Sequence, residues 1–107
     1  MVYNITVHLY ANSHPEPIAK MKAKLVEASR VFINDRETIK WFVMQDVHDP
    51  RVFCIVERFK NKASQKHYLE DLYWKTFDPY ILLLLERSMH LRRHEELDTS
   101  KEVVVPE

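Results

Sequence analysis

The 107-residue sequence contains no glycine and a single cysteine. Glycine-rich loops that cradle nucleotide phosphates need backbone conformations that other residues do not provide. The absence of glycine therefore excludes the loops of both nucleoside-triphosphate and dinucleotide sites. Cys54 lies in an apolar stretch and has no partner for a disulfide within the chain. A reducing compartment suits such a chain, and we expect it to be cytoplasmic.

Net charge and long apolar runs are also lacking. The 16 basic and 16 acidic side chains cancel, so no overall field favours nucleic acid or an anionic membrane. No apolar run approaches the roughly 20 residues that span a bilayer, and the first ten residues lack the pattern of a secretory signal. The length predicts one domain with one core. We expect no nucleic-acid partner and no membrane contact.

Periodicity in the first 60 residues predicts a strand, a helix and a hairpin. Residues 4–11 alternate between apolar and polar side chains, as in a strand with one buried face. A helix is expected from Pro15 to about residue 34, because apolar residues recur there at helical spacing. Residues 38–47 and 51–60 are rich in β-branched and aromatic side chains, and the His-Asp-Pro sequence between them favours a turn.

The second half predicts short helices and a fourth strand. Residues 62–71 are polar and helix-favouring, and an apolar stripe at steps of three and four follows them. Pro79 lacks an amide donor, and Asp78 before it could cap a new helix, so we expect a break or kink there. Alternation returns in residues 88–97, which predicts the fourth strand.

This order of elements indicates an α+β fold, a split βαβ sheet with helices covering one face. The strands at 38–47 and 51–60 are apolar on both sides, so the other face also needs cover. A second copy of the chain is the simplest cover, because monomers seldom expose so large an apolar patch. We expect a homodimer in which residues 1–97 form the domain. The polar tail 98–107, with three β-prone valines, could pair with the partner subunit.

A series of short stretches stands out by order and spacing over about residues 3–97. The most specific is a glutamate and an aromatic residue two positions apart, followed by an alanine and a helix with histidine-x-leucine. Together they resemble the antibiotic biosynthesis monooxygenase family. The stretches are Ile5-Thr6-Val7-His8-Leu9-Tyr10-Ala11, Met44-Gln45-Asp46-Val47 with Asp49-Pro50, Val56-Glu57-Arg58-Phe59 with Ala63, His67-Tyr68-Leu69, and Tyr73-Trp74-Lys75-Thr76-Phe77.

The resemblance implies a ferredoxin-like βαββαβ subunit that packs on its twin as a dimeric α/β barrel, with a pocket between sheet and helices in each subunit. Members of the family differ in activity. Some oxidise aromatic polyketides with dioxygen and no cofactor, some degrade haem, and others act on quinones or signalling molecules. Haem-degrading members carry an iron-ligating histidine one turn after the aromatic pair, where this chain reads Trp74-Lys75-Thr76-Phe77-Asp78. We therefore expect no haem.

The function that follows is a cofactor-independent monooxygenase that oxidises a small aromatic or otherwise acidic organic substrate with dioxygen. Triplet dioxygen reacts slowly with closed-shell molecules, so the substrate itself must become an electron-rich anion. The protein must then supply an apolar cavity, a base or hydrogen-bond donor, and aromatic walls. The alternatives are a non-catalytic dimeric barrel that binds a hydrophobic small molecule and, less favoured, a haem-degrading enzyme.

His67 and Trp74 are the catalytic candidates. His67 matches the family's recurrent histidine, and a side chain that titrates near neutral pH would suit a base or a donor to a phenolate. Bracing the helix against the sheet is the alternative role. Trp74 could stack on a substrate ring, or it could belong simply to the core stripe.

Six residues are candidates for substrate binding. Thr6 and His8 share a strand face that, by analogy with the family, looks toward the helices. The aromatic candidates could hold a flat ring or donate a hydrogen bond. The six are Thr6, His8, Glu57, Phe59, Tyr73 and Phe77.

Glu57 is charged within an otherwise apolar strand. An unpaired buried carboxylate is costly, so this residue should either form an ion pair or carry a raised pKa in the pocket. We favour a structural ion pair, with Arg58, Arg92 or Arg93 as its partner, or a role at an interface.

A metal site is not expected. His90 and His94 lie on one strand face but about 13 Å apart when extended, too far to share an ion. No acidic or cysteine ligand stands at a recognisable spacing.

Overall fold

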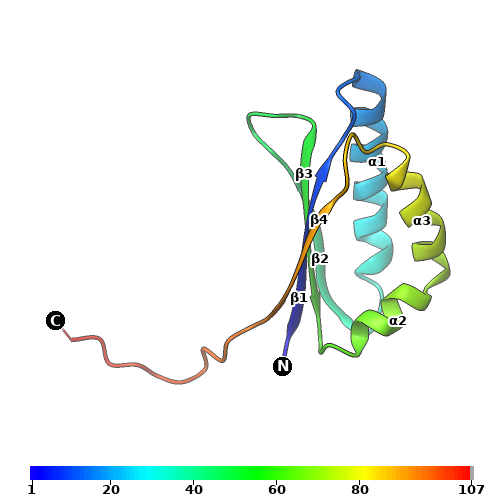
Figure 1. Ribbon diagram of the computed structural model, residues 1–107. Coiled ribbons are helices and arrows are strands. Elements are labelled where there is room, and N and C mark those ends of the chain that lie inside the picture. Colours follow the sequence, from blue (N-terminus) through cyan, green and yellow to red (C-terminus); the bar gives the residue numbers. More distant parts are fainter. Residues whose placement is uncertain (107) are drawn as a thin grey trace.

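The computed structural model describes residues 1–106 and consists of a four-stranded antiparallel sheet with three helices on one face (Figure 1). The helices are α1 (Pro15–Phe32), α2 (Ser64–Glu70) and α3 (Leu72–Leu82). The open sheet has the order β2-β3-β1-β4. This arrangement confirms the α+β, ferredoxin-like expectation. The strands are β1 (Tyr3–Tyr10), β2 (Thr38–Gln45), β3 (Val52–Phe59) and β4 (His90–Glu95).

The alternation of β1 decides which side of the sheet the helices cover. Ile5, Val7 and Leu9 are buried beneath the helices, and the residues between them face the other side. Helix α1 begins at Pro15, where a missing amide donor costs nothing. It buries one stripe against the sheet, made of Met21, Leu25, Ala28 and Phe32.

The chain breaks between α2 and α3 at Asp71, not at Pro79. Asp71 has extended backbone, and its carboxylate accepts a hydrogen bond of 2.7 Å from the Tyr73 amide, which caps α3. Pro79 lies inside α3. The carbonyl that loses its donor there belongs to the exposed residue Lys75, where water can replace the amide. Two or three short helices were expected in place of one long one, and two are present, but the break at Pro79 and the cap at Asp78 are wrong.

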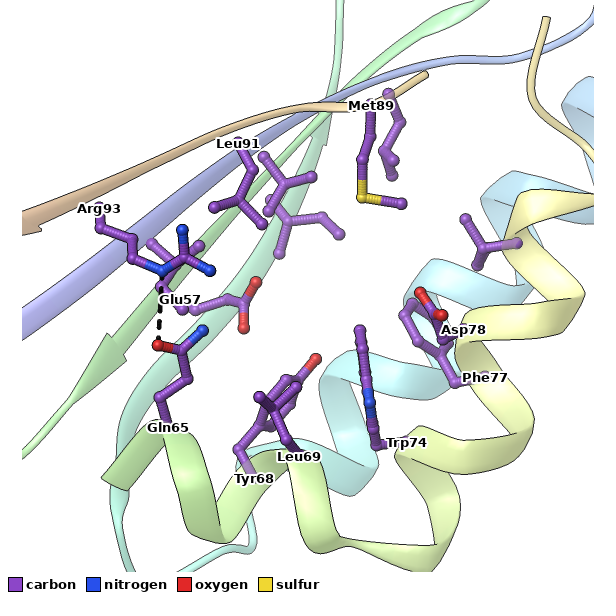
Figure 2. Close-up of a pocket in the computed structure, with 15 residues that line it drawn as sticks. Glu57, Gln65, Tyr68, Leu69, Trp74, Phe77, Asp78, Met89, Leu91 and Arg93 are labelled. Atoms are coloured by element: carbon purple, nitrogen blue, oxygen red, sulfur yellow. Dashed lines mark hydrogen bonds between the residues drawn. The ribbon is translucent and has the colours of Figure 1, made fainter. Parts of the chain in front are cut away.

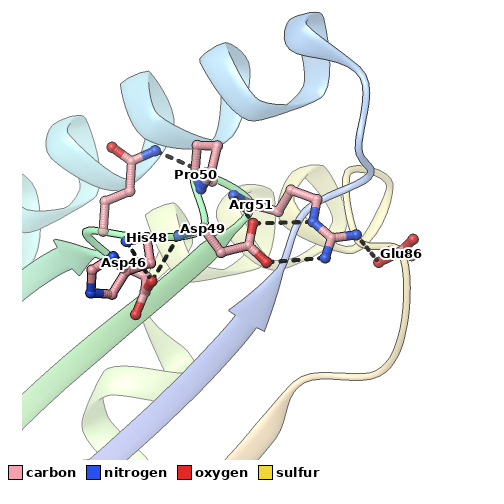
Figure 3. A network of polar contacts seen from close by, with 7 residues as sticks. Asp46, His48, Asp49, Pro50, Arg51 and Glu86 are labelled. Atoms are coloured by element: carbon pink, nitrogen blue, oxygen red, sulfur yellow. Dashed lines mark hydrogen bonds and ion pairs between the residues drawn. The ribbon is translucent and has the colours of Figure 1, made fainter.

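The turn between β2 and β3 keeps its shape without glycine, and no residue from 1 to 106 has a positive φ. Asp46 Oδ2 accepts hydrogen bonds of 2.8 Å from the amides of His48 and Asp49 (Figure 3). Asp49 in turn binds Arg51, whose guanidinium also reaches Glu86 in the segment before β4. Aspartate side chains thus supply the local bonds that fix the turn.

The sheet face opposite the helices is uncovered in the single chain. Phe42 and Met44 are exposed on it, and Cys54 and Val56 are half-buried. Its closure by a second copy, as a dimeric barrel, stays a prediction. No helix among residues 1–106 is both long and apolar enough to cross a membrane.

The C-terminal segment leaves the domain after one anchoring contact. Glu96 accepts hydrogen bonds from Asn4 and Arg58, each at 2.6 Å, and the chain then runs away from the sheet (Figure 1). Val103, Val104 and Val105 are exposed. Pairing of these valines with a partner subunit stays a prediction.

Candidate functional site

A cavity of about 240 Å³ lies between the helix-facing side of the sheet and helices α2 and α3 (Figure 2). Ile5, Val7 and Ile55 form an apolar floor. The volume is just below the range of roughly 300–1,000 Å³ typical of pockets for drug-sized ligands. It suits a small ligand with few polar groups.

Glu57 belongs to a row of side chains that crosses the helix-facing side of the sheet. It pairs with Trp41 on β2 and with Ile5 on β1, and Ile5 pairs with Arg93 on β4. A strand spacing of about 4.8 Å puts the backbone of Arg93 two strands, or about 10 Å, from that of Glu57. The cavity therefore presents a carboxyl and a guanidinium at separate points with an apolar residue between them.

The Glu57 carboxyl is buried in the cavity wall. The residue is 4% exposed, and Oε1 has no hydrogen-bond partner. Burial raises the pKa of Glu57 to about 8, although the neighbouring side chains of Trp41 and Tyr68 lower it by a smaller amount. At neutral pH this carboxyl is mostly protonated, which makes it both a hydrogen-bond donor and a potential proton acceptor at higher pH.

None of the three nearby arginines neutralises Glu57. Arg58 and Arg92 lie on the other face of the sheet, because strand alternation directs them there. Arg93 shares the face of Glu57 but donates a long hydrogen bond of 3.5 Å to Gln65 (Figure 2). The expected ion pair is wrong, and the alternative of a raised pKa in the pocket holds.

Three aromatic side chains from α2 and α3 form the wall opposite the sheet. The Trp74 ring centroid lies 5.0 Å from that of Tyr68 and 6.1 Å from that of Phe77. Burial, together with the charge of Glu57, raises the pKa of the Tyr68 hydroxyl well above its usual value, so this group stays a donor. Asp78 follows on the same wall, and burial raises the pKa of its carboxyl too.

Glu57, Trp74 and Phe77 are the predicted site residues that the structure brings together (Figure 2). Trp74 is only half-buried and lines the cavity, so a bound ring could stack on it. Phe59 is fully buried and packs behind the wall, with its ring centroid 5.4 Å from that of Tyr68. It supports the site without lining it.

Thr6 and His8 lie on the sheet face away from the cavity. Ile5 and Val7, the alternating apolar residues of β1, face the helices instead. The expectation that Thr6 and His8 look toward the helices is wrong, because the helices bury the apolar side of this strand and leave its polar side outside.

His67 and Tyr73 make contacts with other elements rather than lining the cavity. His67 Nε2 lies 3.1 Å from Asp35 Oδ2, and the imidazole is half-exposed. This contact braces α2 against the segment that follows α1. The Tyr73 hydroxyl donates a hydrogen bond of 2.6 Å to Glu27 on α1. A part in catalysis or substrate binding for either residue stays a prediction.

Gln65, Tyr68, Asp78 and Arg93 also line the cavity, although none of them was among the candidate residues chosen from the sequence. One signal was available, because Gln65 and Tyr68 are three residues apart and so share a helix face. The contribution of Asp78 was hidden by its position before a proline, which suggested a helix cap. Arg93 was considered as an ion-pair partner of Glu57.

No group of three or more histidine, cysteine, aspartate or glutamate side chains within residues 1–106 has the geometry to hold a metal ion. The cavity offers a different chemistry, with one buried carboxyl, one buried hydroxyl and a guanidinium at its exposed side. These groups suit a small flat organic molecule that carries one or two oxygen atoms.

The fold and the cavity define a ferredoxin-like α+β domain with a ligand-sized pocket between sheet and helices. Similar solved structures include an antibiotic biosynthesis monooxygenase, with a TM-score of 0.81 at 12% identity over 90% of this chain and 99% of that chain. A Deinococcus radiodurans protein assigned provisionally to the same class has a TM-score of 0.80 at 17% identity, covering 97% and 100% of the two chains. A conserved protein from Methanosarcina mazei Go1 has a TM-score of 0.83 at 12% identity, covering 91% and 94%.

No protein-family model and no curated protein matches the chain. At identities this low, the structural likeness establishes a shared fold. That fold is the one that the sequence resemblance implied.

Proposed function

We propose that this chain is a cofactor-independent monooxygenase of the antibiotic biosynthesis monooxygenase type, which oxidises a small aromatic or otherwise acidic organic substrate with dioxygen. The observation that carries the proposal is a buried carboxyl in an apolar cavity with aromatic walls. Such a cavity keeps water from a reactive anion, and its polar groups are few and fixed in position.

The reaction on a ring methylene balances without a further reductant. Two hydrogens leave the carbon, one oxygen atom of dioxygen becomes the new carbonyl oxygen, and the other leaves as water with those two hydrogens. The carbon is oxidised by four electrons and dioxygen is reduced by four. In this scheme Tyr68, Trp74 and Phe77 hold the ring, and the Tyr68 hydroxyl can donate a hydrogen bond to a substrate oxygen.

Oxygen consumption tests the proposal. Metal-free protein is given a panel of anthrones and hydroquinones in an oxygen electrode, and one dioxygen should be consumed per quinone product formed. Trp74→Ala should lower kcat/KM at least tenfold, because the stacking wall is lost, whereas Leu72→Ala, at an exposed position of the same helix, should not.

Absence of uptake above a heat-killed control, with retained binding of the same compounds, would instead favour a non-catalytic barrel that binds hydrophobic molecules. The largely apolar floor of the cavity is the feature that supports this second function.

The proposal includes a homodimer and a cytoplasmic location. Phe42 and Met44, exposed on the open sheet face, support the dimer, because a second sheet would cover them. The free thiol of Cys54 suits a reducing compartment.

A further inference from the structure

We propose that Glu57 is the group that takes a proton from the bound substrate. This inference rests on the proposed function, since it names the base of the same cavity.

The placement of Glu57 is unusual for a residue with only a structural role. Its Oε1 is buried and has no hydrogen-bond partner, although the residue lines a cavity large enough for a ligand. A buried polar atom without a partner costs roughly 1–3 kcal/mol. A ligand that brings an O–H or an acidified C–H to the Glu57 carboxyl would supply a contact that the protein itself does not.

The groups around Glu57 explain why it can act as a base. Trp41 flanks it on β2 and Ile5 on β1, and neither carries a charge. Tyr68 faces it from α2 as a neutral donor. Of the charged groups that line the cavity, Asp78 comes from α3 and is itself an acid, and Arg93 comes from β4 and forms no salt bridge with Glu57 among residues 1–106.

Burial then sets the strength of the base. The pKa of Glu57, raised to about 8, lies much closer to that of a phenol or enol than the pKa of an exposed glutamate does. Proton transfer is most effective when the two values approach each other. The carboxylate form, which is the active one, becomes dominant above about pH 8.

Charge conservation favours an uncharged substrate. Before transfer, the cavity holds the Glu57 carboxylate and a neutral ligand. After transfer, it holds a neutral Glu57 and a ligand anion, so one negative charge is present at both stages. A substrate that arrived as an anion would add a second negative charge beside the Glu57 carboxylate, over an apolar floor and two strands away from the guanidinium of Arg93, which is unfavourable.

The same proton completes the reaction. The carbanion or enolate transfers one electron to dioxygen, and the resulting radical pair combines to form a peroxide anion on the ring carbon. Protonated Glu57 returns its proton to that anion, and the hydroperoxide then loses water to leave the carbonyl. Glu57 ends as the carboxylate with which it began.

Hydrogen exchange without oxygen tests this role separately from oxidation. Anthrone is incubated anaerobically in deuterated buffer, and loss of its methylene proton signal is followed by nuclear magnetic resonance. The wild-type protein should accelerate the exchange at least tenfold over buffer, with a rate that rises through an ionisation near pH 8. Glu57→Gln should lose at least nine-tenths of this acceleration, and Glu70→Gln, at an exposed site on α2, should keep it.

The outcomes separate the two proposals. Exchange in Glu57→Gln at the wild-type rate would overturn the role of Glu57, even if oxygen uptake were normal. Glu57-dependent exchange without oxygen uptake would support the base and overturn the monooxygenase. If Glu57→Gln does not fold, as judged by circular dichroism, the wild-type pH profile decides, because exchange that does not change between pH 6 and 9 relative to buffer overturns the inference.

Discussion

The two faces of the sheet are built from the same strands but carry different side chains. On the helix-covered face, Trp41, Glu57, Ile5 and Arg93 form one row from β2 to β4. On the open face, a parallel row three residues along contains Met44, Cys54, His8 and His90. The first row is closed by the chain's own helices and holds the only candidate site with a buried carboxyl among residues 1–106. The second has no cover within residues 1–106.

The difference shows how one strand can serve two purposes. In β3, Ile55 is 3% exposed beneath the helices, whereas its neighbour Val56 is only half-buried on the open face. Side-chain alternation alone separates the residue that belongs to the core from the residue that stays half-exposed.

The largest expected effect comes from this neighbouring pair. Ile55→Ala should lower the free energy of unfolding by about 2–5 kcal/mol, because it leaves a cavity in the core. Val56→Ala should cost roughly 1 kcal/mol in dilute protein and more at concentrations where a dimer forms. Urea unfolding at two protein concentrations measures both, and equal losses in the two variants would show that the faces do not differ as described.

Glu57 should make stability fall as pH rises. Its folded-state pKa of about 8 lies above the ordinary value of 4.5. At a pH between these two pKa values, the unfolded chain has released a proton that the folded chain retains. From pH 4.5 to 8.5 the wild type should therefore lose roughly 2–4 kcal/mol relative to Glu57→Gln. Urea unfolding at both pH values gives the difference. A constant gap between the two proteins would mean that the carboxyl is not buried in solution.

A charge on the open face should weaken a dimer. Phe42→Asp should raise the dimer dissociation constant about 30-fold, or about 2 kcal/mol, because the carboxylate would lose water on association. Sedimentation velocity over a concentration series measures this. Leu72→Asp, exposed on α3, is the matched control and should behave as wild type. A wild-type protein that stays monomeric over the whole concentration series would refute the proposal that a second copy covers the open face.

The smallest effect is expected at His67. Its contact with Asp35 is half-exposed, so His67→Ala should change the free energy of unfolding by about 1 kcal/mol or less. Oxygen uptake should remain at the wild-type rate, because the imidazole does not line the cavity. Lys66→Ala, an exposed neighbour, serves as the control for helix propensity. A tenfold loss of uptake in His67→Ala alone would restore the catalytic role suggested by the family resemblance.

The fold was predictable because periodicity is a local signal. Alternation in β1, helical spacing from Pro15 onward and the apolar hairpin each gave an element that the structure contains. The break in the helical region was misplaced. The sequence shows that Pro79 lacks an amide donor, but it does not show that the carbonyl left without this donor, that of Lys75, is exposed to water. Asp71 carries little signal in the sequence, but in the structure its carboxylate caps α3.

The site was predictable only in part, because a pocket depends on which side chains converge from distant elements. Glu57, Trp74 and Phe77 were found, since a charge in an apolar strand and aromatics in a helix stripe are visible in sequence. The face of Thr6 and His8 was taken from a family analogy and was wrong. The alternation in β1 placed the apolar residues toward the helices, and that physical signal outweighed the analogy.

The extended residue between α2 and α3 divides the wall of the cavity into two parts. Tyr68 lies before Asp71 and Trp74 after it, and their ring centroids are 5.0 Å apart. Asp71 is bonded on both sides, because its amide donates to the Tyr68 carbonyl and its carboxylate accepts from the Tyr73 amide. The spacing of the two rings therefore depends on one residue that belongs to neither helix.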